Sequence, residues 1–292
     1  MEGVKYHEPV LVREVIENLA APLNSKKVID ATLGSAGHSL ALAKEGFEVL
    51  GIEIDPEILT LAKKRIKGKN IKAVYGNFRE IKEIAEKNGF EKVSNILFDL
   101  GVSNLHLKSS QRGFSFGHPE AILDMRLDPK KQGLSAADLI NLLREDQLVT
   151  LFSRVLKYFQ AKRLVREIIR KRQYRKIETV GDFLKICQVV RGKSGLNPGT
   201  LPLLALRMAV NSELENLKEA LPNAFSLLVP SGRLLVITFH SEEEKIVKDF
   251  FFETERENLG KVLTKKSIIP NNFEIENNPS SRSAELWILE KK

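Results

Sequence analysis

The sequence predicts an α/β fold in which helices cover both faces of a mainly parallel β-sheet and a helical insertion interrupts the chain. Apolar strand-like runs alternate with amphipathic helical patterns from Lys27 to about Val102, and strand-like sequence resumes after Asn211. Between these stretches the patterns are helical, with no convincing strand. Because strands return afterwards, we interpret the chain as one domain, residues 1–104 and 206–292, that carries an insertion at residues 105–205.

Four short apolar runs form the expected strands of the first part: KVIDAT, EVLGIEID, IKAVYGN and NILFDLGV. Amphipathic helices are expected around Ser39–Lys44, Pro56–Lys67 and Phe78–Asn88, and Pro9 is expected to open an earlier one. Apolar strands separated by amphipathic helices are typical of a parallel sheet that is covered on both faces. This part therefore predicts the core of the sheet.

The second part continues the same pattern with different closing elements. A helix in SELENLKEALPNAFSLLVP is followed by a strand in GRLLVITFH and a helix in SEEEKIVKDFFFE. The runs GKVLTKK and AELWILEK are expected to close the sheet as two antiparallel strands.

The composition is that of an ordinary globular protein, with 42% hydrophobic and 29% charged residues. The longest apolar runs are too short to span a bilayer, and the first residues lack the basic-then-apolar layout of a signal peptide. Cys187 is the only cysteine, so no intrachain disulfide can form. These features favour a cytoplasmic protein with no membrane partner.

Basic residues are in excess, and the formal net charge is +8. Ten Lys and Arg residues stand between Arg154 and Lys176, against one acid, Glu167. Such a run is most simply a solvated helix face, and it also suits a polyanionic partner.

The stretch VIDATLGSAGHSLALAKEGFEVLGIEIDP, Val28–Pro56, has the strand, glycine turn, helix and strand of a nucleotide-binding unit. Its turn, GSAGH, contains GxxG but not the GxGxxG that brings the backbone close to a dinucleotide pyrophosphate. Asp30, at the end of the first strand, would repel a phosphate and suits a cationic, phosphate-free ligand such as S-adenosylmethionine (SAM). Glu53 ends the second strand, where an acid can accept hydrogen bonds from a ribose diol. Together these residues predict a SAM site, whereas the glycines alone would indicate only a strand-to-helix turn.

Asp99 stands at the carboxyl end of the fourth expected strand, where open α/β sheets bind their ligands. SAM-dependent N-methyltransferases often have an acid or amide here that accepts a hydrogen bond from the amine being methylated. The segment DLGV differs from their usual Asp/Asn-Pro-Pro-aromatic form. Taken alone, Asp99 could be a strand-end acid that caps the next turn.

Ten segments, in order and in register over nearly the whole chain, together resemble the small-subunit ribosomal RNA methyltransferase H family (RsmH, also called MraW). Any one of them is weak, but ten in register are specific. The matching segments are HEPVLVREV at His7, DATLGSAGHS at Asp30, GNF at Gly76, ILFDLGVS at Ile96, RGFSF at Arg112, LDMRLDP at Leu123, LSAADLIN at Leu134, ALRMAVNSELENL at Ala205, GRLLVITFHSEEEKIVK at Gly232 and NPSSRSAELW at Asn278.

The resemblance implies a Rossmann-like class I SAM-dependent methyltransferase with a helical insertion domain for RNA recognition. It implies methylation of the exocyclic N4 amine of a decoding-centre cytidine in 16S rRNA. We expect the substrate to be the 30S subunit, because one cytidine must be chosen by shape rather than by a short sequence. The SAM contacts that carry over from the family are Ala36, Gly37, His38, Glu53, Phe78, Asp99 and His106.

The sequence departs from the family pattern mainly in the insertion. His106 lies in SNLHLKSS, where the family commonly has Ser-Ser-Pro-Gln-Leu-Asp, so histidine stands in place of glutamine. The run YFQAKRLVREIIRKR replaces a typical Tyr-Gly-Glu-Glu run, and LPLLALRMAVN lacks the usual Thr-Arg-x-Phe-Gln. The cofactor half is therefore closer to the family than the insertion is.

For N4 methylation, Asp99 is the candidate acceptor of an N4 hydrogen, which would relieve the positive charge that develops on the nitrogen. His240 and Ser241 are second candidates for base contact or proton removal, and Asn211 is a candidate to orient the base. Cys187 lies in an apolar helical context and is expected to be a core thiol, not the nucleophile that carbon-5 methylation needs. The five histidines show no metal-ligand spacing, so we expect no required metal.

Arginines and aromatic rings are the candidate RNA contacts, because arginine pairs with phosphate and a ring can stack on a flipped base. The phenylalanines Phe114 and Phe116 could instead belong to the core of the insertion. The basic run from Arg154 to Lys176 is a further candidate for contact with phosphate. The individual candidates are Arg112, Phe114, Phe116, Arg126 and Arg282.

Three other functions are open to a sequence of this kind. An NAD-dependent dehydrogenase is disfavoured by the absence of GxGxxG and by Asp30. An RNA-binding or ribosome-assembly factor that keeps SAM only as a structural ligand is compatible with the sequence. A methyltransferase acting on another RNA, or on DNA, would use the same amine chemistry, although we expect no DNA partner. The sequence does not indicate the oligomeric state.

Overall fold

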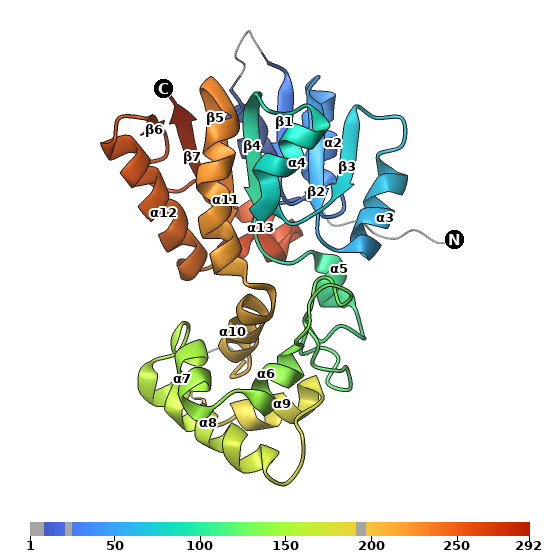
Figure 1. Ribbon diagram of the computed structural model, residues 1–292, viewed down its shortest axis with the longest axis vertical. Coiled ribbons are helices and arrows are strands. Elements are labelled where there is room, and N and C mark those ends of the chain that lie inside the picture. Colours follow the sequence, from blue (N-terminus) through green and yellow to red (C-terminus); the bar gives the residue numbers. More distant parts are fainter. Residues whose placement is uncertain (1–8, 21–24, 191–196) are drawn as a thin grey trace. The chain divides into compact units, whose positions relative to one another are not determined.

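A computed structural model describes residues 9–20, 25–190 and 197–292, which divide into two compact units (Figure 1). One unit combines the chain up to Gly101 with Leu214–Lys292, and the other spans Val102–Glu213. The second unit begins and ends close to the limits of the expected insertion, residues 105–205. His7, with which the first family-like segment begins, lies outside the described residues.

The first unit contains a seven-stranded sheet with the strand order β3-β2-β1-β4-β5-β7-β6. The first five of these strands are parallel, and β7 runs antiparallel to both β5 and β6. The α/β class and the two antiparallel closing strands are thereby confirmed. The strands are β1 (Lys27–Asp30), β2 (Glu48–Glu53), β3 (Ile71–Tyr75), β4 (Val93–Asp99), β5 (Leu228–Thr238), β6 (Gly260–Val262) and β7 (Glu285–Lys291).

Helices cover both faces of this sheet because its central strands are apolar on both sides. In β4, Ile96 and Phe98 pack into the core on one face, and Leu97 packs into the core on the other. The first face is covered by α4 (Ile81–Asn88), α11 (Glu213–Leu227) and α12 (Ser241–Arg256). The second face is covered by α1 (Val12–Glu17), α2 (Gly37–Lys44) and α3 (Pro56–Arg65).

Local signals explain where these helices begin. Asp55 caps α3 by accepting hydrogen bonds from the backbone N–H groups of Glu57 and Ile58, and Pro56 fills the first helical position. The expected helix at Phe78–Asn88 is split, because a 3₁₀ turn (Phe78–Glu80) precedes α4. The first helix starts later than Pro9, with Leu11 as its N-cap in the left-handed conformation. A short helix α13 (Asn272–Asn277) and a 3₁₀ turn (Pro279–Ser283) complete the unit.

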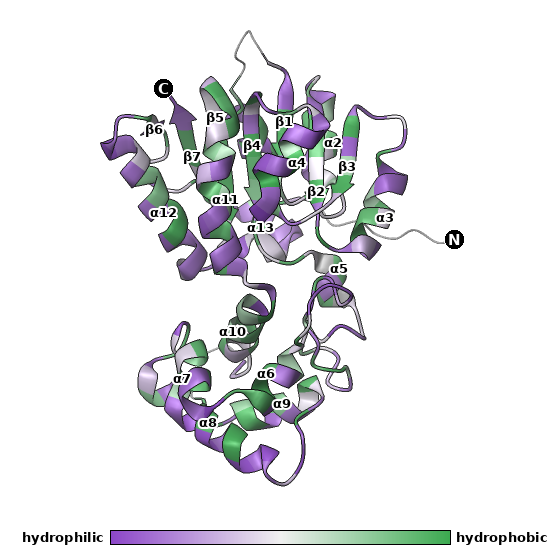
Figure 2. Cartoon of the chain, in the orientation of Figure 1, coloured by the Kyte–Doolittle hydropathy of each residue, from purple (hydrophilic) through white to green (hydrophobic). Residues whose placement is uncertain are grey.

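The second unit is helical, and its described residues form no strand. Its buried side chains form one apolar cluster that includes Phe152, Leu164, Phe183 and Leu206, together with Cys187. Figure 2 shows that its helices carry both hydrophilic and hydrophobic residues, as expected when one side faces a small core. The helices are α5 (Asn104–Lys108), α6 (Ala136–Leu142), α7 (Glu145–Ser153), α8 (Tyr158–Arg172), α9 (Val180–Cys187) and α10 (Thr200–Asn211).

Within the described chain, no helix combines the length and apolar character needed to cross a membrane. Cys187 is fully buried, and burial raises the pKa of its thiol far above the ordinary value.

Candidate active site

Three acidic residues mark the carboxyl ends of three neighbouring strands. Asp30 ends β1, Glu53 ends β2 and Asp99 ends β4, and β1 lies between β2 and β4 in the sheet. The carboxyl ends of parallel strands meet at one edge, which is where open α/β sheets bind ligands. The structure therefore brings these three predicted residues to the same edge.

The turn between β1 and α2 lies at this edge and has an unusual backbone conformation. Ala36 adopts the left-handed conformation, with φ of 66°, and serves as the N-cap of α2. Gly37 lies so close to Pro9 that a Cβ atom at this position would come within 2.9 Å of the Pro9 Cγ. Glycine is therefore required at position 37 because a neighbouring ring occupies the space of a side chain.

Glu53 ties this turn to the second strand. Its Oε2 accepts a hydrogen bond from the Gly34 N–H, and its Oε1 accepts one from the Asp55 N–H, both at 2.8 Å. Burial raises the pKa of Glu53 to about 7, although these two hydrogen bonds oppose the rise. Each carboxylate oxygen can accept a second hydrogen bond, so Glu53 still has acceptor sites for a ribose diol.

Asp30 is buried beneath the turn and is hydrogen-bonded at both oxygens. Ser39 Oγ donates to Oδ2 at 2.7 Å, and the Thr32 N–H donates to Oδ1 at 3.2 Å. Burial raises the pKa of Asp30, and these donors and the nearby His38 oppose the rise. The structure thus uses Asp30 to hold the start of α2 against β1.

Asp99 is the acid of this edge that keeps an oxygen free. Its backbone N–H donates to Thr32 Oγ1 at 2.7 Å, and its Oδ2 lies 3.6 Å from His38 Nδ1. Its buried Oδ1 has no hydrogen-bond partner among the residues that the structure describes. Burial raises the pKa of Asp99 to about 6, while His38 lowers it and the acids Asp30 and Glu243 raise it further. A donor on a ligand would stabilise this carboxyl group.

Phe78 follows β3 and packs beside the same edge. Its ring meets that of Phe98, the residue before Asp99, in an edge-to-face contact with 5.6 Å between the ring centres. The predicted SAM contacts of the first unit, from Ala36 to Asp99, therefore all lie along the turn and the carboxyl ends of β2, β3 and β4.

His240 follows β5, whose carboxyl end lies beside that of β4, since Ile237 pairs with Asp99. Its side chain caps α12: Nδ1 accepts a hydrogen bond from the Glu243 N–H at 3.3 Å, and Nε2 lies 3.1 Å from Glu243 Oε1. Ser241 is the first residue of α12. His240 is thus near the correct edge, but its described contacts are with its own helix.

Asn211 ends α10 in the second unit, and its amide group fastens a loop. Nδ2 donates to the carbonyls of Met125 and Arg207, and Oδ1 accepts from the Leu127 N–H and from Gln132 Nε2. Four hydrogen bonds occupy the usual capacity of an amide. The structure therefore gives Asn211 a role in shape, and orientation of the base by this side chain has no support here.

Arg112 and Arg126, both predicted to contact RNA, hold the same loop together. Arg112 donates to the carbonyls of Arg126 and Leu127. Arg126 forms a two-bond pair with Asp124, at 2.7 and 2.9 Å, and donates to the Gln132 carbonyl. Burial opposes ionisation of Asp124, but Arg126 prevails and holds the pKa of Asp124 below its ordinary value. Both guanidinium groups are engaged within the unit.

Phe114 lies in the core of the second unit, with 7% of its surface exposed, and its ring packs 5.0 Å from that of His106. The ring of Phe116, the other predicted stacking residue, is exposed, with 49% of the residue's surface accessible. A buried ring offers no face to a base, so the stacking role predicted for Phe114 suits Phe116 better.

His106 belongs to the second unit, whereas the other predicted SAM contacts belong to the first. Arg282 is exposed in the 3₁₀ turn before β7.

Sequence reasoning missed four residues of this site: Pro9, Thr32, Ser39 and Glu243. Thr32 and Ser39 are small polar residues next to the glycine turn, a signal that could have found them. Pro9 and Glu243 act from distant parts of the chain, although the segments HEPVLVREV and GRLLVITFHSEEEKIVK contain them.

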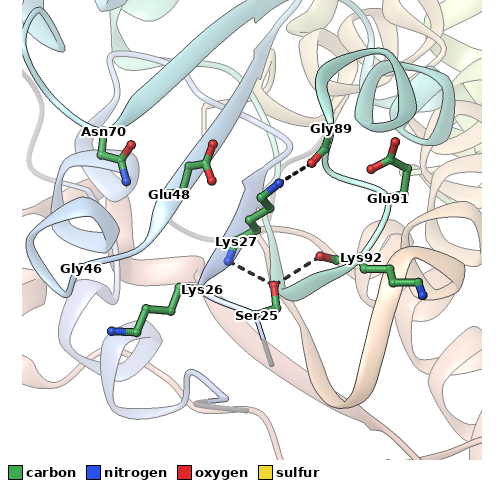
Figure 3. A pocket seen from close by; sticks show the side chains of 9 residues that line it. All are labelled: Ser25, Lys26, Lys27, Gly46, Glu48, Asn70, Gly89, Glu91 and Lys92. Carbon is green, nitrogen blue, oxygen red and sulfur yellow. Dashed lines mark hydrogen bonds between the residues drawn. The ribbon is translucent and has the colours of Figure 1, made fainter. Parts of the chain in front are cut away.

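A separate pocket lies at the opposite edge of the sheet, around the amino ends of β1, β2 and β4 (Figure 3). Its polar groups are partly satisfied by one another: Lys27 Nζ donates to the Gly89 carbonyl, and Ser25 Oγ donates to the Lys92 carbonyl. None of the predicted site residues lines this pocket.

The family model described as the MraW methylase family matches residues 4–292. The chain belongs to the MraW methylase family. It is 40% identical to the "Ribosomal RNA small subunit methyltransferase H" of Methylacidiphilum infernorum, over 99% of this chain and 96% of that protein. It is 38% identical to the protein of the same name from Coprothermobacter proteolyticus, over 98% and 96%.

Among solved structures, an rRNA methylase from Streptococcus thermophilus aligns with this MraW-family chain at a TM-score of 0.44 and 12% identity, over 96% of this chain and 93% of its own. The fold of this MraW-family chain rests on its own sheet order and on the family match.

Proposed function

We propose that this protein transfers the methyl group of SAM to the exocyclic N4 amine of a decoding-centre cytidine in 16S rRNA. Membership of a methylase family and the names of the full-length relatives support SAM-dependent methylation of small-subunit rRNA. The choice of an amine rests on one observation: Asp99, a carboxylate with a free oxygen, stands at the carboxyl end of β4. The only cysteine is buried in the other unit, where it cannot serve carbon-5 chemistry.

SAM fits the side chains at this edge. Its ammonium and sulfonium groups are cationic, and the edge carries the acids Glu53 and Asp99, with Asp30 buried beneath the turn. Glu53 would orient the ribose through its remaining acceptor sites, and the turn at Ala36 and Gly37 would lie against the ligand. The unpartnered Oδ1 of Asp99 is a buried polar atom that a ligand donor would satisfy. When bound, SAM supplies an electrophilic methyl group on a positively charged sulfur.

The residues of the chain then position the amine and take its proton. Holding N4 in line with the methyl carbon and sulfur can supply roughly 7–11 kcal/mol of the barrier. As the nitrogen–carbon bond forms, N4 becomes positive, and Asp99 accepts its hydrogen. Because Asp99 must be ionised to do so, a pKa of about 6 leaves it ready near neutral pH.

The helical unit is the proposed RNA-recognition domain, and α8 is its best-suited surface. Several cations of the basic run are occupied: Arg172 donates to the Ile140 and Leu143 carbonyls, Arg175 pairs with Asp182, and Arg170 pairs with Glu167. Arg163 and Arg166 are exposed and pair with no residue in the described part of the chain.

These two arginines share one face of α8 with an exposed ring. Phe159, Arg163, Arg166 and Arg170 are spaced by four, three and four residues, which places them in one stripe. Phe159 is 67% exposed. Guanidinium groups beside an open ring suit a phosphate backbone and an unstacked base. We name Phe159, Arg163, Arg166 and Arg170 the α8 stripe.

Labelled methyl transfer tests the function directly. The protein is incubated with radiolabelled SAM and 30S subunits that lack the modification, and the digested RNA is separated into nucleosides. We expect label in N4-methylcytidine. Label in another nucleoside would retain the methyltransferase and overturn the target, and no label with SAM still bound would point to a non-catalytic RNA-binding factor.

A further inference from the structure

The side chain of His38 is held in one orientation inside the first unit. It is buried at the start of α2, and its Nε2 lies 2.8 Å from the carbonyl oxygen of Val10. A carbonyl can only accept a hydrogen bond, so Nε2 carries a proton. The other ring nitrogen, Nδ1, faces Asp99 Oδ2 at 3.6 Å.

This orientation limits the protonation states of the pair. A neutral His38 with its proton on Nε2 would turn the lone pair of Nδ1 toward Asp99, which an ionised carboxylate would disfavour. Two arrangements avoid that clash: His38 carries a second proton on Nδ1 beside an ionised Asp99, or Asp99 is protonated and donates to Nδ1. In both, one proton lies between the two side chains.

The surroundings of Asp99 oppose its ionisation. Asp30 at the end of β1 and Glu243 in α12 are both buried acids that act on Asp99, and His38 in α2 is the group that acts in the other direction. Asp30 is hydrogen-bonded to Ser39 and Thr32, and Glu243 Oε2 accepts from the Phe239 N–H. The charge of His38 is therefore placed where it favours an ionised Asp99.

We propose that His38 is a positioning residue for methyl transfer, which shares a proton with Asp99 and sets the pH at which Asp99 can accept the proton of the substrate amine. This role rests on the proposed function and adds to it, because the family resemblance assigns position 38 only to SAM contact. The proposed role depends on the side chain of His38, which points to Asp99 and Val10.

The step balances without a further reactant. The N4 lone pair forms the bond to the methyl carbon, and the carbon–sulfur bond breaks with its electron pair left on sulfur, which gives S-adenosylhomocysteine. The methylated nitrogen releases one proton to Asp99, and water takes that proton when product leaves. His38 keeps its own proton on Nε2 throughout, bonded to Val10.

The pH dependence of methyl transfer tests the role. His38→Gln keeps a donor for the Val10 carbonyl but removes the charge, so Asp99 should ionise only at a higher pH. We expect the acidic limb of the kcat profile to move up by about one pH unit, with about tenfold loss below the limb and recovery near pH 9. Assays at saturating SAM separate this shift from any loss of the SAM contact expected at position 38. His118→Gln makes the same substitution in the other unit, is the matched control and should leave the limb in place.

A uniform loss of rate at every pH, or an unmoved limb, would overturn the role of His38. A second measurement needs no variant of His38 and no catalysis. Nitrogen-15 NMR of the histidine rings in the full protein should show a proton on Nε2 of His38, the nitrogen that faces the Val10 carbonyl, and Asp99→Asn should change the signal of Nδ1, the nitrogen that faces position 99. If His38 instead carries its single proton on Nδ1, the proposal fails, whatever RNA the protein methylates.

Discussion

Glu53, which is buried, and Asp99, which is partly buried, are carboxylates at one edge of the sheet, but their oxygens are used differently. Glu53 has a backbone N–H on each oxygen and holds the glycine turn. Asp99 faces His38 with one oxygen and leaves the other without a described partner. The hydrogen bonds therefore indicate that Glu53 shapes the site and that Asp99 is available for chemistry.

Asp99→Asn should abolish activity while making the protein more stable at neutral pH. Loss of the proton acceptor is expected to lower kcat by about 10²–10⁴-fold. At pH 8 the wild-type carboxyl is ionised in both states, and only the folded state bears the cost of burying the charge, since burial raises the pKa of Asp99 to about 6. The variant should therefore have the higher free energy of unfolding at pH 8. This gain should shrink as the pH falls from 6 to about 4, below which the carboxyl is protonated in both states.

Denaturant unfolding at a series of pH values, together with the labelled-methyl assay, measures both effects. A variant that is inactive and also less stable at pH 8 would contradict the account, because it would show that Asp99 supports the fold.

Gly37→Ala should damage the turn by contact with Pro9. An added Cβ would lie 2.9 Å from the Pro9 Cγ, and a proline ring cannot rotate away. Overpacking of this kind typically costs about 1–3 kcal/mol. Thermal unfolding and SAM titration should both show the loss. Gly133→Ala is the control, because a Cβ there has nothing within 4 Å.

At the scale of elements, helices α8 and α10 have different roles in the helical unit. The end of α10 fastens the loop that contains Arg112 and Arg126, through Asn211. The α8 stripe is directed to solvent, and its exposed ring has no place in the apolar core of the unit. One helix shapes the unit, and the other offers a surface for RNA.

Charge reversal on α8 should weaken RNA binding without affecting SAM. In the Arg163→Glu/Arg166→Glu variant, we expect KM for the 30S substrate to rise about tenfold or more, with kcat at saturation little changed. The slope of log affinity against log salt should fall by about 0.7–0.9 for each phosphate group that the variant no longer neutralises. Lys63→Glu/Lys64→Glu on α3 makes the same charge change on exposed residues of the other unit. Equal losses in the two variants would show a general charge effect and no docking surface.

Asn211→Ala separates a role in shape from a role at the base. Four hydrogen bonds are removed, and the Met125 carbonyl and Leu127 N–H are left without their partner, so we expect a destabilisation of about 1–3 kcal/mol. SAM affinity should be retained. A stable variant with a lowered kcat would restore Asn211 as a residue that orients the base.

For the whole molecule, the buried side chains form separate cores in the two units. Calorimetry should therefore resolve two unfolding transitions. S-adenosylhomocysteine at about 100 times its dissociation constant should raise the stability of the sheet-containing unit by about 2.7 kcal/mol and leave the other transition in place. One transition that shifts as a whole would show that the units unfold together.

The sheet could be predicted from the sequence because its signals are local. Strand β1 contains the apolar pair Val28 and Ile29, strand β4 contains the apolar run Ile96–Phe98, and the acids at the strand ends stand next to these residues. The fate of the arginines could not be read in this way. Arg112 and Arg126 bind backbone carbonyls and a carboxylate, and the letters RGF and DMR do not distinguish such bonds from contacts with RNA. The His38–Asp99 pair joins residues from two elements that are distant in the sequence, so only the folded structure reveals it.

Cys187 gives the protein a reporter of its own motion. Because this single thiol is enclosed in the core of the helical unit, a thiol reagent can react with it only when that unit opens. The rate at which the reagent labels the unaltered protein therefore measures how often the helical unit opens. Opening of the sheet-containing unit does not contribute to this rate. A cysteine introduced anywhere on the surface would react first, so a single dye or cross-linker could be attached without removing the native residue.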